Sequence, residues 1–233
     1  IKQLEKIDRI EVDEVDTAML NLKFPPAPRS GSYPVIMEDV AKRYGDHLIF
    51  EHATLTINRG DKVAFVGKNG EGKSTLVKCI MGEIDFEGKL QLGHNVKIGY
   101  FAQNQAQLLD DKLTVFDTID YVAQGDIRTK IRDILGAFMF GGEASDKKVE
   151  VLSGGERSRL AMIRLLLEPV NLLILDEPTN HLDLMTIEWL EDTLKAYPGS
   201  LLMISHDRTF LSKLSKRTFW LDRGQLRTLE KGY

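Results

Sequence analysis

A glycine-rich segment at residues 67–74 holds the residue types that bind phosphate groups. The segment reads Gly-Lys-Asn-Gly-Glu-Gly-Lys-Ser, which fits the pattern G-x-x-x-x-G-K-[ST]. It follows the apolar run Val63–Val66. Glycines let the backbone curl so that successive N–H groups converge on an anion, and a helix that begins there adds the positive end of its dipole. Average residue usage would produce this pattern by chance in about 1% of chains of this length. We therefore interpret the segment as a phosphate-binding loop rather than as a plain glycine-rich turn.

The side chains of this loop have expected roles in binding a nucleoside triphosphate. Lys73 should reach the β- and γ-phosphates, and the Ser74 hydroxyl should ligate Mg²⁺. Contacts with the nucleotide are expected from the loop and the first helical turn after it, at Gly67, Asn69, Gly70, Gly72, Lys73, Ser74 and Thr75.

Two acids, Asp176 and Glu177, follow a second apolar run at Leu172–Leu175. A buried parallel strand has this composition, and ligands of α/β proteins bind outside the carboxyl ends of such strands. Asp176 is placed to hold Mg²⁺, directly or through a water, and Glu177 can polarise an attacking water as a general base. The alternative is that the two acids only cap the turn before Pro178.

These groups need a scaffold, and the chain alternates β-rich runs with helical ones. Strands are predicted at Val35–Val40, Ala53–Ile57, Lys62–Val66, Lys89–Leu92, Val96–Phe101, Leu172–Asp176, Leu201–Ile204, Thr218–Leu221 and Gln225–Leu229. Helices are predicted from about Gly72 to Met81, Asp183 to Ala196 and Arg208 to Leu214, with a mostly helical stretch at about 103–167 that is broken at Gly125, Gly136 and Gly141-Gly142. The alternation predicts an α/β fold with a largely parallel sheet and a helical insertion.

Composition is that of an ordinary globular protein. The chain has 233 residues, 42% of them hydrophobic and 28% charged, and a formal net charge of -4, which gives no global attraction to nucleic acid or membrane. No window approaches the roughly 20 apolar residues of a membrane span. The single cysteine, Cys79, cannot form an internal disulfide, which favours a reducing, cytoplasmic compartment.

The segment Leu152-Ser153-Gly154-Gly155-Glu156 resembles the signature motif of the ATP-binding-cassette (ABC) superfamily. It opens a helix with an apolar stripe at Leu160, Ile163 and Leu167. A helix N-terminus with glycine-exposed amides suits a γ-phosphate, so the resemblance implies nucleotide contacts from Ser153 and Gly155. Taken alone, the same letters fit an ordinary N-capped helix.

Other positions match this superfamily in its order along the chain. Tyr44 resembles the aromatic residue that stacks on adenine, and Gln103 resembles the glutamine that senses the metal and the γ-phosphate, with Gln105 as a weaker competitor. Asp183 resembles the loop that crosses to the opposing domain, and His206 resembles the histidine that contacts the γ-phosphate. Ordinary surface or capping roles are expected for the other histidines, His47, His52, His94 and His181.

The resemblance implies a composite ATPase. Two cassettes would pair head-to-tail around ATP, so that the phosphate loop of one faces the signature motif of the other, and one cassette alone would hydrolyse ATP poorly. The implied cofactors are ATP and Mg²⁺, with Glu177, His206, Gln103 and Lys73 as catalytic residues and Ser74, Gln103 and Asp176 at the metal. The implied fold is a P-loop NTPase-type, mostly parallel sheet core with an antiparallel β edge and a helical subdomain at about 104–168.

Finer features resemble the ABC-F branch, whose members are twin-cassette proteins that act on ribosomes. They are the segments at 152–159, 176–183 and 205–211. Residues 1–32, a charged segment at Lys2–Asp16 and a proline-rich stretch, resemble the end of the linker between two cassettes, and 33–233 would be the second cassette. The alternative for Ile1–Asn21 is an ordinary solvated helix or a disordered leader. The chain begins with Ile1 rather than Met, which we interpret as a piece of a longer protein.

The partners follow from this resemblance. They would be a second ABC domain, in the same longer chain or as a homodimer of this one, and the ribosome with its rRNA and tRNA. Arg157, Arg159 and Arg164 could touch RNA phosphates or could be an ordinary charged helix face. The alternative function is the cytosolic nucleotide-binding subunit of a membrane transporter. DNA-repair ATPases of similar fold carry much longer coiled-coil insertions.

Overall fold

The computed structural model describes residues 24–233, so the charged linker segment predicted at Lys2–Asp16 lies outside the described residues. Its centre is a six-stranded sheet in the order β5-β6-β7-β3-β8-β9. All neighbouring strands run parallel except β8 and β9, which are antiparallel. The strands are β3 (Lys62–Val66), β5 (Ile98–Phe101), β6 (Leu172–Asp176), β7 (Ser200–Ile204), β8 (Arg217–Asp222) and β9 (Gln225–Leu229).

A second, antiparallel sheet has the order β2-β1-β4. Its strands are β1 (Val35–Tyr44), β2 (His47–Ile57) and β4 (Glu87–Leu92), and the first two are much longer than the sequence predicts. The β1–β2 pairing shifts register several times, and Asp39 and His52 adopt positive φ angles of 50° and 53° there. An ion pair of 2.6 Å joins their side chains. Such bulges hide a strand from a period-two search, because the alternation of side chains is interrupted.

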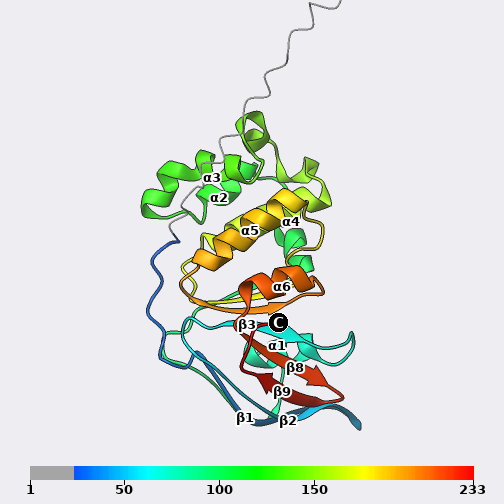
Figure 1. Ribbon diagram of the computed structural model, residues 1–233. Helices are drawn as coiled ribbons and strands as arrows, with labels where there is room; N and C mark the ends of the chain where they lie inside the picture. Colours follow the sequence, from blue (N-terminus) through cyan, green and yellow to red (C-terminus); the bar gives the residue numbers. More distant parts are fainter. Residues whose placement is uncertain (1–23) are drawn as a thin grey trace, which may run out of the picture.

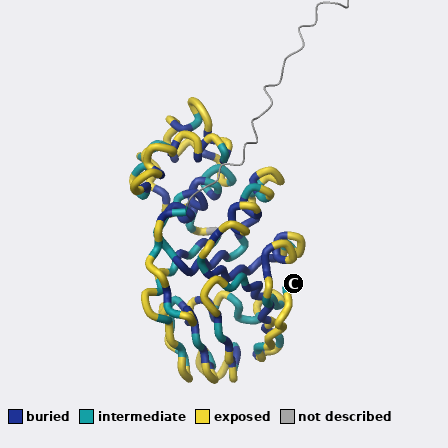
Figure 2. The backbone as a smooth tube through the Cα atoms, turned by 60° about the vertical axis from the view of Figure 1, so that its left-hand side comes forward, coloured by how far each residue is buried: buried dark blue, intermediate teal, exposed yellow. Residues whose placement is uncertain are grey.

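Two hydrophobic clusters cover the two faces of the central sheet. Successive residues of a strand point to opposite faces, so Leu173 and Leu175 of β6 face one cluster while Leu172 and Ile174 face the other. The first cluster contains α4 (Gly154–Leu166), α5 (Leu184–Ala196) and α6 (Arg208–Leu214), and the second contains α1 (Lys73–Ile80) and the antiparallel sheet. Figures 1 and 2 show these layers, with buried backbone along the central strands.

The predicted helical stretch consists mostly of short turns. It contains η1 (Gln103–Leu108), α2 (Val115–Asp120), η2 (Gly125–Lys130), α3 (Ile131–Ala137), η3 (Gly142–Asp146), η4 (Val149–Val151) and α4. Gly125 begins a turn as a break would, and α3 ends at Ala137, one residue after the break predicted at Gly136. Helices α2 and α3 lie at one end of the molecule (Figure 1), whereas α4 belongs to the cluster on the first face of the central sheet. No helix within residues 24–233 has the length and apolar character to cross a membrane.

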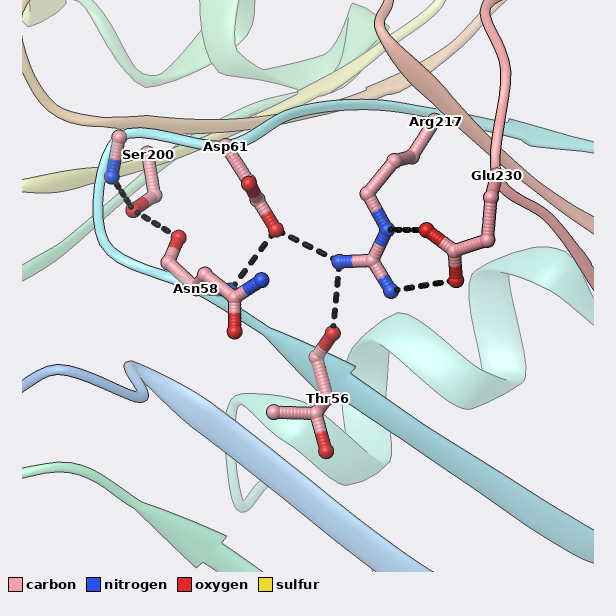
Figure 3. Close-up of polar contacts among 7 residues, drawn as sticks. Thr56, Asn58, Asp61, Ser200, Arg217 and Glu230 are labelled. Carbon is pink, nitrogen blue, oxygen red and sulfur yellow. Dashed lines mark hydrogen bonds and ion pairs between the residues drawn. The ribbon is translucent and has the colours of Figure 1, made fainter.

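At the amino ends of the parallel strands, a polar cluster holds the two sheets together (Figure 3). Arg217, at the start of β8, donates from Nη1 to Asp61 Oδ2 at 2.6 Å and to the Thr56 carbonyl at 3.0 Å. Its Nε lies 3.1 Å from Glu230 Oε2. Asp61 Oδ2 also accepts from the Asn58 N–H at 2.9 Å. One guanidinium therefore ties β2, the turn before β3, β8 and the chain after β9 together.

Candidate functional site

The phosphate-binding loop lies between β3 and α1, at the carboxyl end of the central sheet. Its backbone passes so close to neighbours that glycine is required. A Cβ added to Gly67 would lie 2.5 Å from the Leu221 carbonyl oxygen, and one added to Gly72 would collide with the Ile49 side chain. Gly72 also has a φ of 97°, which other residues rarely adopt. The spacing of glycines in the sequence therefore has a steric cause.

Lys73 begins α1 and folds back over the loop. Its Nζ donates to the carbonyl oxygens of Gly67 at 2.7 Å and Lys68 at 2.9 Å. Burial lowers the pKa of Lys73, and the carboxylates of Glu177 and Asp176 act in the opposite direction. A partly desolvated cation inside a curl of backbone is suited to bind a phosphate anion.

The Ser74 hydroxyl donates to Asp176 Oδ2 at 3.3 Å, which joins the phosphate loop to the end of β6. These residues are 102 positions apart in sequence, and the fold brings them together. Burial raises the pKa of the Asp176 carboxyl, while Ser74, Lys73 and Tyr100 lower it. The two oxygens form a compact hard-donor pair at the carboxyl end of the sheet.

Glu177 stands next to Asp176 in an uncommon backbone conformation, with a φ of 51°. Its N–H donates to the Ile204 carbonyl at 2.8 Å, and its Oε2 accepts from the His206 N–H at 3.3 Å. His206 Nε2 lies 3.4 Å from the other carboxylate oxygen. Burial raises the pKa of Glu177, and the backbone and side chain of His206 lower it. The predicted base and the predicted histidine are thus in direct contact.

Tyr100, on the neighbouring strand β5, is a site residue that the sequence interpretation missed. Its hydroxyl is hydrogen-bonded to Asp176, and burial, together with the charge of Asp176, raises the pKa of Tyr100 to about 12. The phenol therefore stays protonated and donates to the carboxylate. The signal in the sequence was weak, since Tyr100 is one aromatic residue in an apolar strand three positions before Gln103.

The signature segment forms the cap of α4. Ser153 Oγ accepts from the Glu156 N–H at 3.2 Å, and Glu156 Oε2 accepts from the Ser153 N–H at 3.0 Å, which is a complete capping box. A Cβ at Gly155 would lie 2.8 Å from the His181 carbonyl oxygen, so α4 begins directly against the turn that leads to Asp183. Both bonds of Ser153 remain within its own helix, and neither joins it to the phosphate loop.

Of the remaining predicted residues, Tyr44 and Asp183 contact residues outside this cluster. Tyr44 ends β1 with its side chain exposed, and Lys42 Nζ lies 4.8 Å from its ring centroid. Asp183 caps α5 by accepting from the Thr186 N–H at 2.8 Å. Gln103 begins η1, but its side chain lies outside the described residues. Asn69 and Gly70 are exposed and Thr75 is half-buried at the start of α1, so the loop is open to a large ligand or partner.

The arginines of α4 mostly have internal partners. Arg157 Nη2 pairs with Asp111 Oδ1 at 2.5 Å, and Arg159 Nη1 donates to the Phe138 carbonyl at 3.0 Å. The ordinary structural role therefore accounts for both residues.

A glycine-rich loop between a parallel strand and a helix, with an acid pair at the end of a neighbouring strand, defines a P-loop nucleoside triphosphatase. The ABC transporter family matches residues 50–180, more than half of the chain. The chain belongs to this family and is an ABC-type ATPase domain.

Curated relatives agree with this assignment. ABC transporter F family member 5 of Arabidopsis thaliana is 40% identical over 229 residues, which are 97% of this chain and 33% of that protein. The ATP-binding protein Uup of Caulobacter vibrioides is 42% identical over 203 residues, 84% of this chain and 33% of that protein. The predicted resemblance to F-type cassettes is confirmed. The chain spans about a third of the length of these relatives.

Solved structures share the fold. A bacterial Atm1-family ABC exporter with ATP bound matches with a TM-score of 0.73 and 24% identity over 87% of this chain and 39% of that chain. A dimeric ATP-binding cassette in a post-hydrolysis state with ADP and Pi matches with a TM-score of 0.70 and 23% identity over 84% of this chain and 98% of that chain. The predicted fold class, a mostly parallel core with an antiparallel edge and added helices, is confirmed.

Proposed function

We propose that this cassette binds MgATP at the carboxyl end of its central sheet and hydrolyses it when a second cassette closes over the nucleotide. One observation carries the proposal: the line of contacts from Ser74 to Asp176 and from Glu177 to His206, beside Lys73. Each group in this line has a task in transferring a phosphoryl group to water.

The donor set fits Mg²⁺. This ion takes oxygen ligands at about 2.1 Å in octahedral geometry, which puts neighbouring ligands about 3 Å apart. Ser74 Oγ and Asp176 Oδ2 are 3.3 Å apart. Among the described residues, no three His, Cys, Asp or Glu side chains group to hold a metal, so phosphate oxygens and water would complete the shell. When bound, Mg²⁺ would neutralise charge on the phosphates, and Gln103 is proposed as a further ligand.

The hydrolytic step follows from the position of Glu177. A water between its carboxylate and the γ-phosphate gives a proton to the carboxylate as its oxygen bonds to phosphorus, and the bond to the β,γ-bridging oxygen breaks to release ADP. The raised pKa of Glu177, caused by burial, strengthens it as a base. His206 orients the carboxylate and faces the departing phosphate, and Lys73 stabilises the charge on its oxygens.

A partner cassette completes the site. Phosphate-loop residues Lys68, Asn69 and Gly70 are exposed, and the Ser153 cap lies on a separate helix with no bond to that loop. We assign Ser153 and Gly155 to the γ-phosphate held by the opposing cassette, and Asp183 to the crossing between the two. Tyr44, on the exposed end of β1, would stack on the adenine.

The cellular process proposed is translation, in the cytoplasm. The support is the similarity to F family members and Uup proteins, which are about three times longer than this chain. We propose residues 1–32 as the end of a linker and 33–233 as one cassette of such a parent protein, with a helical subdomain at about 104–168. ATP binding would close the cassettes and allow engagement of rRNA and tRNA, and hydrolysis would release them.

The test uses the parent protein with Glu177→Gln, which should bind ATP and hydrolyse it slowly. After ATP is added to a lysate, sedimentation through a density gradient should show the variant trapped on ribosomes. Glu87→Gln, the same change at an exposed position of β4, is the matched control and should not be trapped. A variant that stays in the unbound fractions would contradict the translation assignment, and one that follows membranes would favour a transporter subunit.

A further inference from the structure

Residues 24–34, which we name the strap, form no helix or strand but are closely packed against the cassette. They run along one side of the molecule towards β1, as the blue segment in Figure 1. Phe24 packs edge-on against Tyr197 with ring centroids 5.1 Å apart. Arg59 Nη1 donates to the Ser30 carbonyl at 2.8 Å, and the Gly31 N–H donates to the His94 carbonyl at 2.8 Å. The proline-rich stretch is therefore an ordered part of the cassette.

Asn171 is the buried centre of these contacts, with only 7% of its surface exposed. Its Nδ2 donates to the Pro28 carbonyl at 2.7 Å and to the Asn95 carbonyl at 2.8 Å, while its Oδ1 accepts from the Lys97 N–H at 2.8 Å. Its own carbonyl accepts from the Ser200 N–H at 2.9 Å. One residue thus ties the strap to the starts of β5, β6 and β7.

The strap touches the far ends of the elements that carry the site. Asn171 directly precedes β6, which ends at Asp176. Tyr197 follows α5, whose first turn is capped by Asp183, and its hydroxyl donates to the Val170 carbonyl at 2.8 Å. Strands and helices in a packed core move as rigid elements, so a shift at one end reaches the other. The strap and the nucleotide site therefore lie at opposite ends of the same elements, β6 and α5.

We propose that Asn171 is a positioning residue that couples the strap to the ATP site, so that the position of the linker and the binding of nucleotide influence each other. This inference rests on the proposed function. Coupling of two sites is reciprocal, so nucleotide binding must change the stability of the strap contacts. Through this coupling, contacts at the amino end of the sheet would influence ATP hydrolysis at its carboxyl end.

Hydrogen exchange of the full chain tests the proposal, with and without a non-hydrolysable ATP analogue and Mg²⁺. In the wild type the analogue should slow exchange in 67–75 and also in 24–34, by about fivefold or more, the low end of usual coupling. Asn171→Asp keeps the shape of the side chain but removes both Nδ2 donors. It should retain protection of 67–75 and lose the nucleotide effect on 24–34.

Two further variants keep the outcome interpretable. Phe24→Ala removes the contact with Tyr197 without burying a charge, and it should also reduce the effect on the strap if Asn171→Asp fails to fold. Asn58→Asp makes the same chemical change at an exposed side chain of the same end, and it should behave as the wild type. Unchanged exchange of 24–34 in the wild type, with 67–75 protected, would overturn the coupling. No protection of 67–75 would overturn the proposed function, and the coupling with it.

Discussion

The two ends of the central sheet are built differently, although the same strands connect them. At the amino end, charged and amide groups make short bonds: Arg217 to Asp61 at 2.6 Å and Asn171 to Pro28 at 2.7 Å. At the carboxyl end the side chains of the two acids make longer contacts, with Ser74 at 3.3 Å from Asp176 and His206 at 3.4 Å from Glu177, although Lys73 Nζ donates to the Gly67 carbonyl at 2.7 Å. At the carboxyl end, burial also raises the pKa values of the adjacent acids Asp176 and Glu177.

The amino end of these strands therefore contributes mainly to stability, and the carboxyl end holds the groups suited to chemistry. Polar groups that already hydrogen-bond to each other stabilise the fold, and these donors and acceptors are not free to bind a ligand. Groups near charges of the same sign lower the stability of the fold, and so does an uncommon backbone conformation such as the φ of 51° at Glu177. Binding of a ligand can compensate for this cost. Substitutions at the two ends should therefore have opposite signatures in activity and stability.

The largest expected effect is loss of hydrolysis in Glu177→Gln, with no loss of stability. Removal of a general base lowers the rate by about 10² to 10⁴. Phosphate release at a concentration where cassettes pair measures the rate, and thermal unfolding measures stability. Glu87→Gln should leave both unchanged. Hydrolysis within threefold of wild type would remove Glu177 from the mechanism.

At the opposite end, Arg217→Ala should lower stability and leave the nucleotide affinity of the folded protein unchanged. Loss of the cation leaves the half-buried Asp61 without its partner, which costs about 3 kcal/mol. For a chain of this size the melting temperature would fall by on the order of 10 °C. Arg227→Ala, at an exposed position of β9, is the matched control. An equal loss in both variants would mean that the cluster adds little.

A smaller effect with the opposite sign is expected for Asp176→Asn at neutral pH. Burial raises the folded-state pKa of Asp176 above the ordinary 3.8, so the folded protein holds this proton more tightly than the unfolded chain does. The charged carboxylate therefore costs stability above the folded pKa, and the cost disappears below 3.8. The amide should raise stability by on the order of 1 kcal/mol at pH 7.5. Melting curves should converge with the wild type as pH falls, and a stability difference that does not depend on pH would contradict this account.

Local signals made much of the site predictable. The glycines of the phosphate loop fix the end of β3 and the start of α1, because a curl that approaches Leu221 and Ile49 tolerates no side chain. Ser153 and Asp183 were also identifiable, since both cap helices through side chains that bond three residues ahead. For these two caps the residues that cause the structure are near one another in sequence.

The contacts that the sequence did not predict join distant segments. Arg217 meets Asp61 across 156 positions, and Asn171 meets Pro28 across 143. Nothing in the neighbourhood of either residue distinguishes it from other polar residues at the start of a strand. The antiparallel edge was predicted, but its strands β1 and β2 are longer than expected, since the bulges at Asp39 and His52 break the alternation that marks a strand.

The close contact between Gly155 and the His181 carbonyl has a thermodynamic consequence for association. Through this contact the start of α4 packs against the turn before Asp183, so the two segments already form one surface in the unpaired cassette. Two cassettes that pair through this surface would lose little conformational entropy of backbone and side chains. The entropy lost on pairing would then be mainly translational and rotational. The encounter would then be limited by how often two ATP-loaded faces collide in the right orientation, which a longer chain carrying both cassettes would increase by raising their effective concentration.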